Sequence, residues 1–191
     1  MEIIDTIKKD LKETLSERRY IHSIGVMEMC AKLAQIYGVD VQKAQIAGLL
    51  HDIAKEMPKE EMFKYVEENN IEITEIEKIS YQILHGKIGA DIAKKKYGLD
   101  EQIQNAIKYH TTTSPEMDTL AKIVYVSDKI EMNRKSEGYD LEYERELAQK
   151  DLDKTVLYII DASIKSLVEK GKLIEKEVDT RNYLILKSLK V

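Results

Sequence analysis

Four histidines and two aspartates are the residues of this chain whose types and spacing best suit chemistry at a buried site. Residues three, four, seven and eight apart share one face of a helix. By this rule the histidines and the second aspartate share faces with aliphatic side chains. Histidine and aspartate rarely enter a core without a partner. A metal ion would satisfy all of them at once, and the alternative is a set of unrelated polar core residues. The six are His22, His51, Asp52, His85, His110 and Asp128.

The adjacent pair His51-Asp52 lies in the most apolar helix that the sequence predicts. We expect this helix to be capped by Asp40 and to run through Lys55. Two neighbouring helical residues diverge by about 100°. They can therefore reach different sides of one ion, or Asp52 can bridge two ions.

The donor types narrow the choice of metal. Imidazole and carboxylate without thiolate suit iron, manganese, zinc, cobalt or nickel. Such an ion lowers the pKa of a bound water and presents hydroxide near neutral pH. Cys30 is the one cysteine, which excludes an intramolecular disulfide and a multi-thiolate zinc site, and we expect it to be a core residue.

Cationic side chains near these metal-binding residues indicate the class of substrate that the site attacks. A site lined with carboxylates needs positive groups to receive phosphate, and we expect Lys55 and Arg134 to serve this purpose. The hydroxyls of residues 111–113 either add further donors or form a simple turn. The remaining nearby cations are expected to be solvated charges, namely Arg18, Arg19 and Lys129.

Helical periodicity runs through almost the whole chain and predicts an all-α fold. The sequence has 8 glycines and 2 prolines in 191 residues and is rich in good helix formers. Residues 69–80 are predicted to be a linking segment, residues 111–115 a loop and residues 134–140 a polar stretch. The predicted helices cover approximately residues 3–15, 18–37, 40–55, 59–68, 85–97, 100–110, 120–133 and 153–170, with a docking helix within 173–191.

Length and charge limit the classes of protein to which the chain can belong. We expect one domain over residues 1–191, with a core at about 18–134 and C-terminal helices at 140–191 packing on it. The net charge of -5 argues against nucleic-acid and anionic-membrane partners. Neither a membrane span nor a signal peptide is predicted, so we expect a cytoplasmic protein. The sequence leaves open whether the chain forms a homodimer.

Five segments surround these residues with characteristic wording. They are RYIHSIGV at 19–26, AGLLHDIAK at 47–55, HGKIGA at 85–90, AIKYHTT at 106–112 and SDKIEMNR at 127–134. His22, then His51-Asp52, then Asp128 resembles the H…HD…D pattern of the HD-domain metal-dependent phosphohydrolases. The segments together look like those of the YqeK group of that superfamily, the bacterial symmetrical diadenosine tetraphosphate hydrolases.

The resemblance implies roles for the metal-binding residues. His85 and His110 would complete a second metal position or contact the substrate phosphates. One or two ions would bind, the first being of the iron type. The ligands of that first ion would be His22, His51, Asp52 and Asp128.

The resemblance also implies a nucleotide pocket lined by Lys55, Thr111 and Arg134, with residues 172–177 closing over the base. Asp52 and Lys55 would then act in catalysis. The chain has Met132 where the group usually has proline, so its base-side contacts can differ from those of the group.

These expectations lead to one principal function and two alternatives. The principal function is metal-dependent hydrolysis of diadenosine tetraphosphate at its centre, which releases two ADP. The first alternative is a phosphohydrolase of mononucleotides or a phosphodiesterase of cyclic nucleotides, because a fold does not fix a substrate. The second is a non-catalytic nucleotide-binding module that regulates a partner protein.

Overall fold

The computed structural model of the chain describes residues 2–135 and 140–189. These residues form helices and connecting loops and contain no strand, so the predicted all-α fold is confirmed. The elements are α1 Glu2–Thr14, α2 Glu17–Tyr37, α3 Val41–Leu50, α4 Lys59–Glu68, α5 Glu75–Ile79, the 3-10 helix η1 Tyr81–Leu84, α6 His85–Tyr97, α7 Glu101–Tyr109, α8 Thr119–Ile130, α9 Leu141–Ala148, α10 Leu152–Glu169 and α11 Glu177–Leu189.

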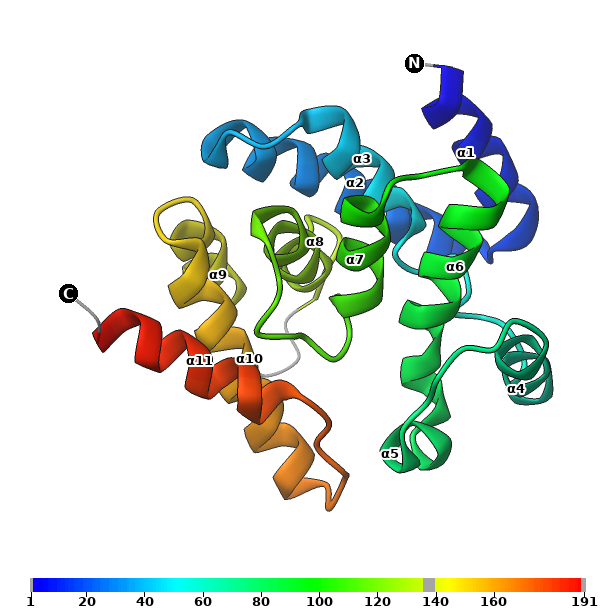
Figure 1. Cartoon of the computed structure of the whole chain (residues 1–191). Helices are drawn as coiled ribbons and strands as arrows, with labels where there is room; N and C mark the ends of the chain where they lie inside the picture. Colours follow the sequence, from blue (N-terminus) through cyan, green and yellow to red (C-terminus); the bar gives the residue numbers. More distant parts are fainter. Residues whose placement is uncertain (1, 136–139, 190–191) are drawn as a thin grey trace.

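Helix α8 lies at the centre of the molecule (Figure 1) and contacts α2, α3, α7 and α10. Nine of its twelve residues are buried, in keeping with a sequence that is apolar around most of the helix. Its buried residues include Ser127 and Asp128 near the C-terminal end. Helix α8 therefore forms the centre of the core and also places the carboxylate of Asp128 inside it.

Short local signals set the ends of most helices. An aspartate side chain accepts the N–H three residues later at the start of α3, α7, α8, α9 and α10. Gly38 and Gly98 end α2 and α6 in the left-handed conformation, with φ of 67° and 62°. The predicted boundaries at these glycines are confirmed.

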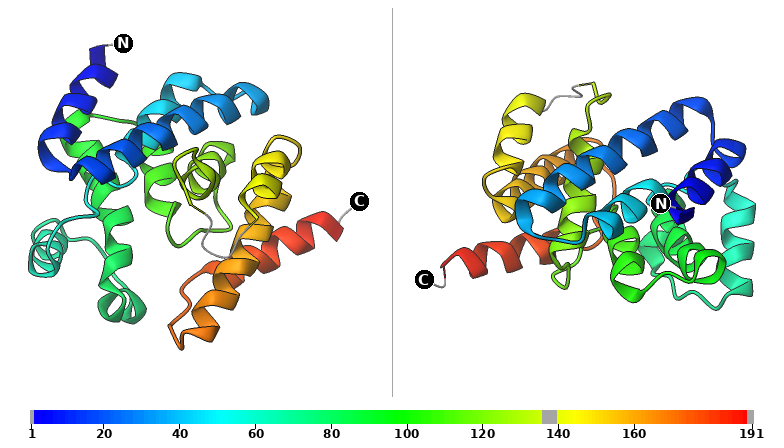
Figure 2. Two further views of the ribbon diagram at one scale, coloured as in Figure 1. Left: turned by 180° about the vertical axis from the view of Figure 1, so that it is seen from behind. Right: turned by 90° about the horizontal axis from the view of Figure 1, so that it is seen from above.

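The remaining helices flank this core on two sides (Figures 1 and 2). Helices α4 and α5 lie beside α6, and helices α9, α10 and α11 lie on the other side of α8. The expected docking helix near the C-terminus is confirmed, since α11 packs on α10 and buries Leu184. No helix within residues 2–135 and 140–189 is both long and apolar enough to cross a membrane.

The helix predicted to run through Lys55 is shorter than expected, because α3 ends at Leu50 and turns follow to Glu56. Within these turns the backbone N–H groups bond to carbonyls three residues back, a tighter spacing than that of an α-helix. The prediction was wrong for this stretch, but Asp52 and Lys55 still lie one turn apart. The bonds are Ile53 N to Leu50 O at 3.1 Å, Lys55 N to Asp52 O at 2.9 Å and Met57 N to Ala54 O at 3.2 Å.

Two further predictions of local structure were wrong. The predicted linker at 69–80 contains α5, which begins with a capping box formed by Thr74 and Glu77. The helix predicted over 120–133 ends at Ile130, since Glu131 has φ -55° and ψ 156° and leaves the helical conformation. Of the polar stretch predicted at 134–140, residues 136–139 lie outside the described residues.

Candidate metal centre

The six residues singled out in the sequence meet at one place, where α2, the turn after α3, α6, the end of α7 and α8 converge. Five of them are buried, and the side chain of His22 keeps 11% of its surface exposed. The group therefore lies inside the helix bundle with one edge open to solvent.

The first group of donors surrounds His22. Its Nε2 atom lies 3.0 Å from Asp128 Oδ1 and 3.3 Å from His51 Nε2. His51 Nε2 in turn lies 3.4 Å from Asp52 Oδ2. One donor atom each from His22, His51 and Asp128 lies within 4.8 Å of the others, which is close enough to share one ion.

The second group of donors uses the other oxygen of Asp52. Asp52 Oδ1 lies 3.1 Å from His85 Nε2 and 3.5 Å from His110 Nε2. The Nε2 atoms of these two histidines are 3.0 Å apart. Asp52 thus contacts both groups of donors through different oxygens.

The tautomers of the buried histidines show that the donors suit a cation. A carbonyl oxygen only accepts hydrogen bonds, so an Nδ1 atom that bonds to one carries a proton, and in a neutral ring the Nε2 lone pair is then free. Burial lowers the pKa of His85, and it lowers the pKa of His110 to about 4, so both rings are neutral. The lone pairs on their Nε2 atoms are therefore free to bind a cation or to accept hydrogen bonds from the nearby Lys55 and Thr111. The bonds are His51 Nδ1 to Gly48 O at 2.7 Å, His85 Nδ1 to Gln82 O at 2.5 Å and His110 Nδ1 to Ile107 O at 2.6 Å.

The two aspartates of the centre are ionised despite their burial. Burial raises the pKa of Asp52, but the charge of His51 and hydrogen bonds with His110, His51 and His85 together hold that pKa well below its usual value. Burial likewise raises the pKa of Asp128, and the charge of Lys129 together with hydrogen bonds from His22 and His51 outweighs it. Burial lowers the pKa of His51, yet the charges and hydrogen bonds of Asp52 and Asp128 together raise it to about 9. A cation that binds here would therefore displace a proton.

Four cationic side chains surround the donors. Lys55 and Arg134 lie where the sequence led us to expect them. Arg19 and Lys129 were expected to be solvated charges, and this was wrong, because each pairs with a buried aspartate. A tertiary contact brings Arg19 to Asp52, whereas Lys129 pairs with its neighbour in the chain, Asp128. Arg18 is exposed, as expected. The contacts are Lys55 Nζ to His85 Nε2 at 3.3 Å, Arg134 Nη2 to Asp128 Oδ1 at 2.8 Å, Arg19 Nη1 to Asp52 Oδ2 at 2.6 Å and Lys129 Nζ to Asp128 Oδ2 at 2.6 Å.

The loop after α7 places one hydroxyl at the second donor group. Thr111 Oγ1 lies 3.3 Å from His85 Nε2 and 3.2 Å from His110 Nε2. Thr113 lies elsewhere, since its hydroxyl donates to Thr180 on α11 at 2.9 Å. Of the two alternatives left open for this loop, the geometry favours a polar contribution from Thr111.

Glu131 belongs to the centre and was missed in the sequence. Its Oε1 atom lies 3.2 Å from His22 Nδ1, on the far side of the ring from the donor group. The spacing of three residues from Asp128 was the available signal, because it places both residues on one helix face. The signal was weak, since Glu131 lies just beyond the end of α8.

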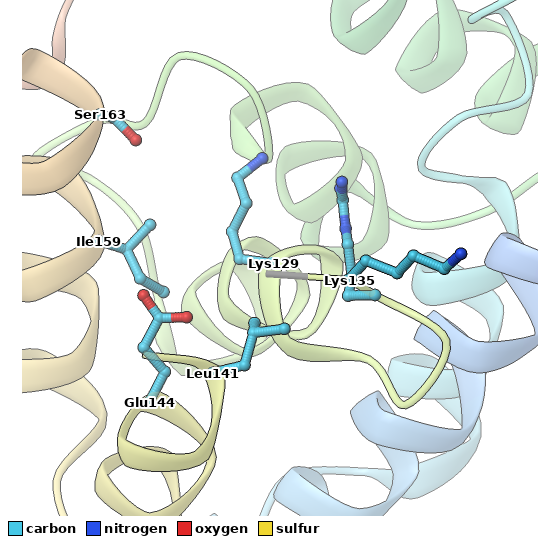
Figure 3. Close-up of a pocket in the computed structure, with 7 residues that line it drawn as sticks. Lys129, Lys135, Leu141, Glu144, Ile159 and Ser163 are labelled. Atoms are coloured by element: carbon cyan, nitrogen blue, oxygen red, sulfur yellow. The ribbon is translucent and has the colours of Figure 1, made fainter. Parts of the chain in front are cut away.

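Two cavities open beside the centre and share Arg134 and Lys135 in their walls. One, of about 220 Å³, lies between the end of α8 and helices α9 and α10. Figure 3 shows Glu144, Ile159 and Ser163 on the side opposite Lys129. The other, of about 670 Å³, is lined by residues that include Arg18, Arg19, His22 and Glu131.

The chain belongs to the HD domain family, whose profile matches residues 19–133. A symmetrical bis(5'-nucleosyl)-tetraphosphatase of Bacillus subtilis is 37% identical, over 85% of this chain and 86% of that protein. A protein of the same name from Staphylococcus aureus is 35% identical, over 94% and 93% of the two chains. A crystal structure from Clostridium acetobutylicum, described as a predicted HD superfamily hydrolase involved in NAD metabolism, is 39% identical with a TM-score of 0.91, covering 96% and 97% of the two chains. These similarities confirm the resemblance found in the sequence.

Proposed function

We propose that this chain is a metal-dependent hydrolase that cleaves diadenosine tetraphosphate symmetrically into two molecules of ADP. The curated relatives with 35–37% identity support this proposal, because they carry the name of that activity and align over most of the chain. The observation that carries it in the structure is the position of Asp52, whose two oxygens contact two groups of histidine donors.

For the metal, we propose that one ion is held by the first group of donors, and iron is our first choice of element. His85 and His110 would hold a second ion or contact phosphate. A bound ion would supply an activated water and neutralise charge that develops on the phosphate oxygens. The proposed ligands of the first ion are His22, His51, Asp52 and Asp128.

Two cations and one hydroxyl near the centre could bind the phosphates in such a reaction. Water attacks one of the two inner phosphorus atoms, and ADP leaves with the bridging oxygen. Lys55, Arg134 and Thr111 lie close enough to the donors to bind the oxygens of the attacked phosphate and its neighbours. The positive charges of the Lys55 ammonium and the Arg134 guanidinium would stabilise the extra negative charge of the transition state.

The two cavities beside the centre favour cleavage in the middle of the substrate. Arg134 lies in the wall of both, and its guanidinium group bonds to Asp128 at the first donor group. Each half of a symmetrical dinucleotide would then extend into one cavity, with the inner phosphates between them.

Three expectations from the sequence stay predictions. They are contacts from residues 172–177 to a base, the cytoplasmic location and the formation of a homodimer.

We also propose that residues 1–191 form one domain, because α8 contacts both the N-terminal helices and α10. The family profile ends at residue 133, so the helices of 140–191 would be an addition that packs on the shared core.

A substrate panel tests the proposed function. Protein purified without added metal is analysed for its elements and is then incubated with diadenosine tetraphosphate, mononucleotides and cyclic nucleotides. Turnover of the dinucleotide above all others supports the proposal. Release of inorganic phosphate from mononucleotides as the fastest reaction would favour the first alternative. Tight binding without turnover under any divalent metal would favour a regulatory module.

A further inference from the structure

His22 differs from the other three histidines of the centre in the partner of its second ring nitrogen. In His51, His85 and His110 that nitrogen bonds to a backbone carbonyl, whereas His22 Nδ1 lies 3.2 Å from the carboxylate of Glu131. A carboxylate is the stronger acceptor. It therefore fixes the proton on Nδ1 and makes Nε2 a better ligand.

The carboxylate of Glu131 is held in one orientation. The residue is 2% exposed, and its Oε2 atom accepts the backbone N–H of Asn133 at 2.6 Å. Its own carbonyl accepts a hydrogen bond from Arg145 Nη2 at 2.8 Å and another from the N–H of Arg134 at 3.0 Å. Because hydrogen bonds hold both the side chain and the backbone of Glu131, its Oε1 atom already faces His22 and does not have to reorient.

Gly25 leaves the space that this carboxylate occupies. It lies three residues after His22 on the same face of α2, and a Cβ atom there would come within 2.3 Å of Glu131 Oε2. A glycine inside a helix is less favourable than alanine, because it loses more backbone entropy on folding. The close approach of Glu131 gives a physical reason for glycine at this position.

We propose that Glu131 is a positioning residue that sets His22 to bind metal through Nε2, and that Gly25 provides the room for it. The inference rests on the proposed metal site and adds to it a residue that does not itself touch the ion. It predicts that removing the carboxylate weakens metal binding while all the ligands stay in place.

The first test measures the dissociation constant of the purified protein for Co²⁺. Glu131→Ala is expected to weaken binding about 10–100-fold, the usual effect of losing an outer partner of a ligating histidine. Ser23→Ala is the matched control, because Ser23 is a buried neighbour of His22 whose hydroxyl has no hydrogen-bond partner among the described residues. At saturating metal, the KM for substrate should stay unchanged in Glu131→Ala while kcat falls.

A spectroscopic test separates positioning from a general loss of structure. In the Co²⁺-loaded protein, the Nδ1 proton of a ligating histidine gives a strongly shifted NMR signal that exchanges with solvent. Glu131→Ala should lose or broaden one such signal, that of His22, because the proton is no longer held. Ser23→Ala should keep every signal of the unmodified protein.

Gly25→Ala gives an independent route to the same effect, in case Glu131→Ala folds poorly. Displacing the carboxylate should weaken Co²⁺ binding, and the change should add nothing further in a protein that already carries Glu131→Ala. Unmodified protein that binds no Co²⁺ would overturn the metal site and this inference together. Equal affinities and equal signals in unmodified and Glu131→Ala protein would overturn this inference alone.

Discussion

The Nε2 atoms of His85 and His110 face each other at 3.0 Å, although neither nitrogen has a proton to share. In both rings the Nδ1–H group donates a hydrogen bond to a backbone carbonyl. Lys55 Nζ lies 3.3 Å from His85 Nε2 and Thr111 Oγ1 lies 3.2 Å from His110 Nε2, so the two lone pairs face hydrogen-bond donors and could also bind a cation.

His85→Ala should spare the tightly bound ion and still reduce turnover steeply, because it removes a donor of the second group only. His22→Ala, in the first group, should strip the tight ion. Elemental analysis of both purified proteins measures this difference. Equal loss of all bound metal from the two variants would contradict the division into two groups.

Asp52→Ala should abolish both metal binding and hydrolysis, since Asp52 contacts both groups of donors. The variant should also be less stable, because buried partners lose their counter-charge. Asp91→Ala is a suitable control, as it removes a partly buried carboxylate paired with Lys95 away from the centre. Full metal content in purified Asp52→Ala protein would refute the bridging role.

Arg134→Ala should lower kcat/KM for diadenosine tetraphosphate by roughly 10–100-fold, the effect of losing a charged phosphate contact worth about 1.5–3 kcal/mol. The amount of bound metal should not change. Arg181→Ala, which removes an arginine paired with Asp161 on the surface, is the control for loss of charge. Equal kcat/KM values for the two variants in steady-state kinetics would exclude a role of Arg134 in substrate binding.

Much of the centre follows from helical periodicity, and the rest depends on tertiary structure. His85 and His110 could be placed because each shares a helix face with aliphatic side chains. The contact of Arg19 with Asp52 could not be foreseen, because it depends on how the turn after α3 packs beside α2. The pair of Lys129 with Asp128 joins neighbours in the chain, but the sequence does not show which way the lysine side chain turns. The early end of α3 was also hidden, since the apolar sequence continues to Ala54 without a helix-breaking residue.

Glu144 should give the stability of the protein a measurable dependence on pH. Burial raises the pKa of this carboxyl from 4.5 to about 7, and the nearby Asp140 adds to the effect. Between these values the folded protein keeps a proton that the unfolded chain has lost. The free energy of unfolding should therefore fall as the pH rises from about 4.5 to 7.

Glu144→Gln removes this titration, so the variant should gain about 1–2 kcal/mol relative to the unmodified protein between pH 5 and pH 8. Urea unfolding at the two pH values measures the gain. Glu142→Gln, at an exposed position on the same helix, should show no such gain. Parallel pH profiles for Glu144→Gln and the unmodified protein would contradict the shifted pKa.

Product chromatography on diadenosine tetraphosphate tests the central claim most directly. The unmodified, metal-loaded protein should convert each substrate molecule into two molecules of ADP, with no ATP or AMP at any time point. In water enriched in oxygen-18, one of the two ADP molecules should carry a single heavy oxygen, as expected for attack at an inner phosphorus. ATP and AMP as the main products would contradict symmetrical cleavage, however well the metal centre is formed.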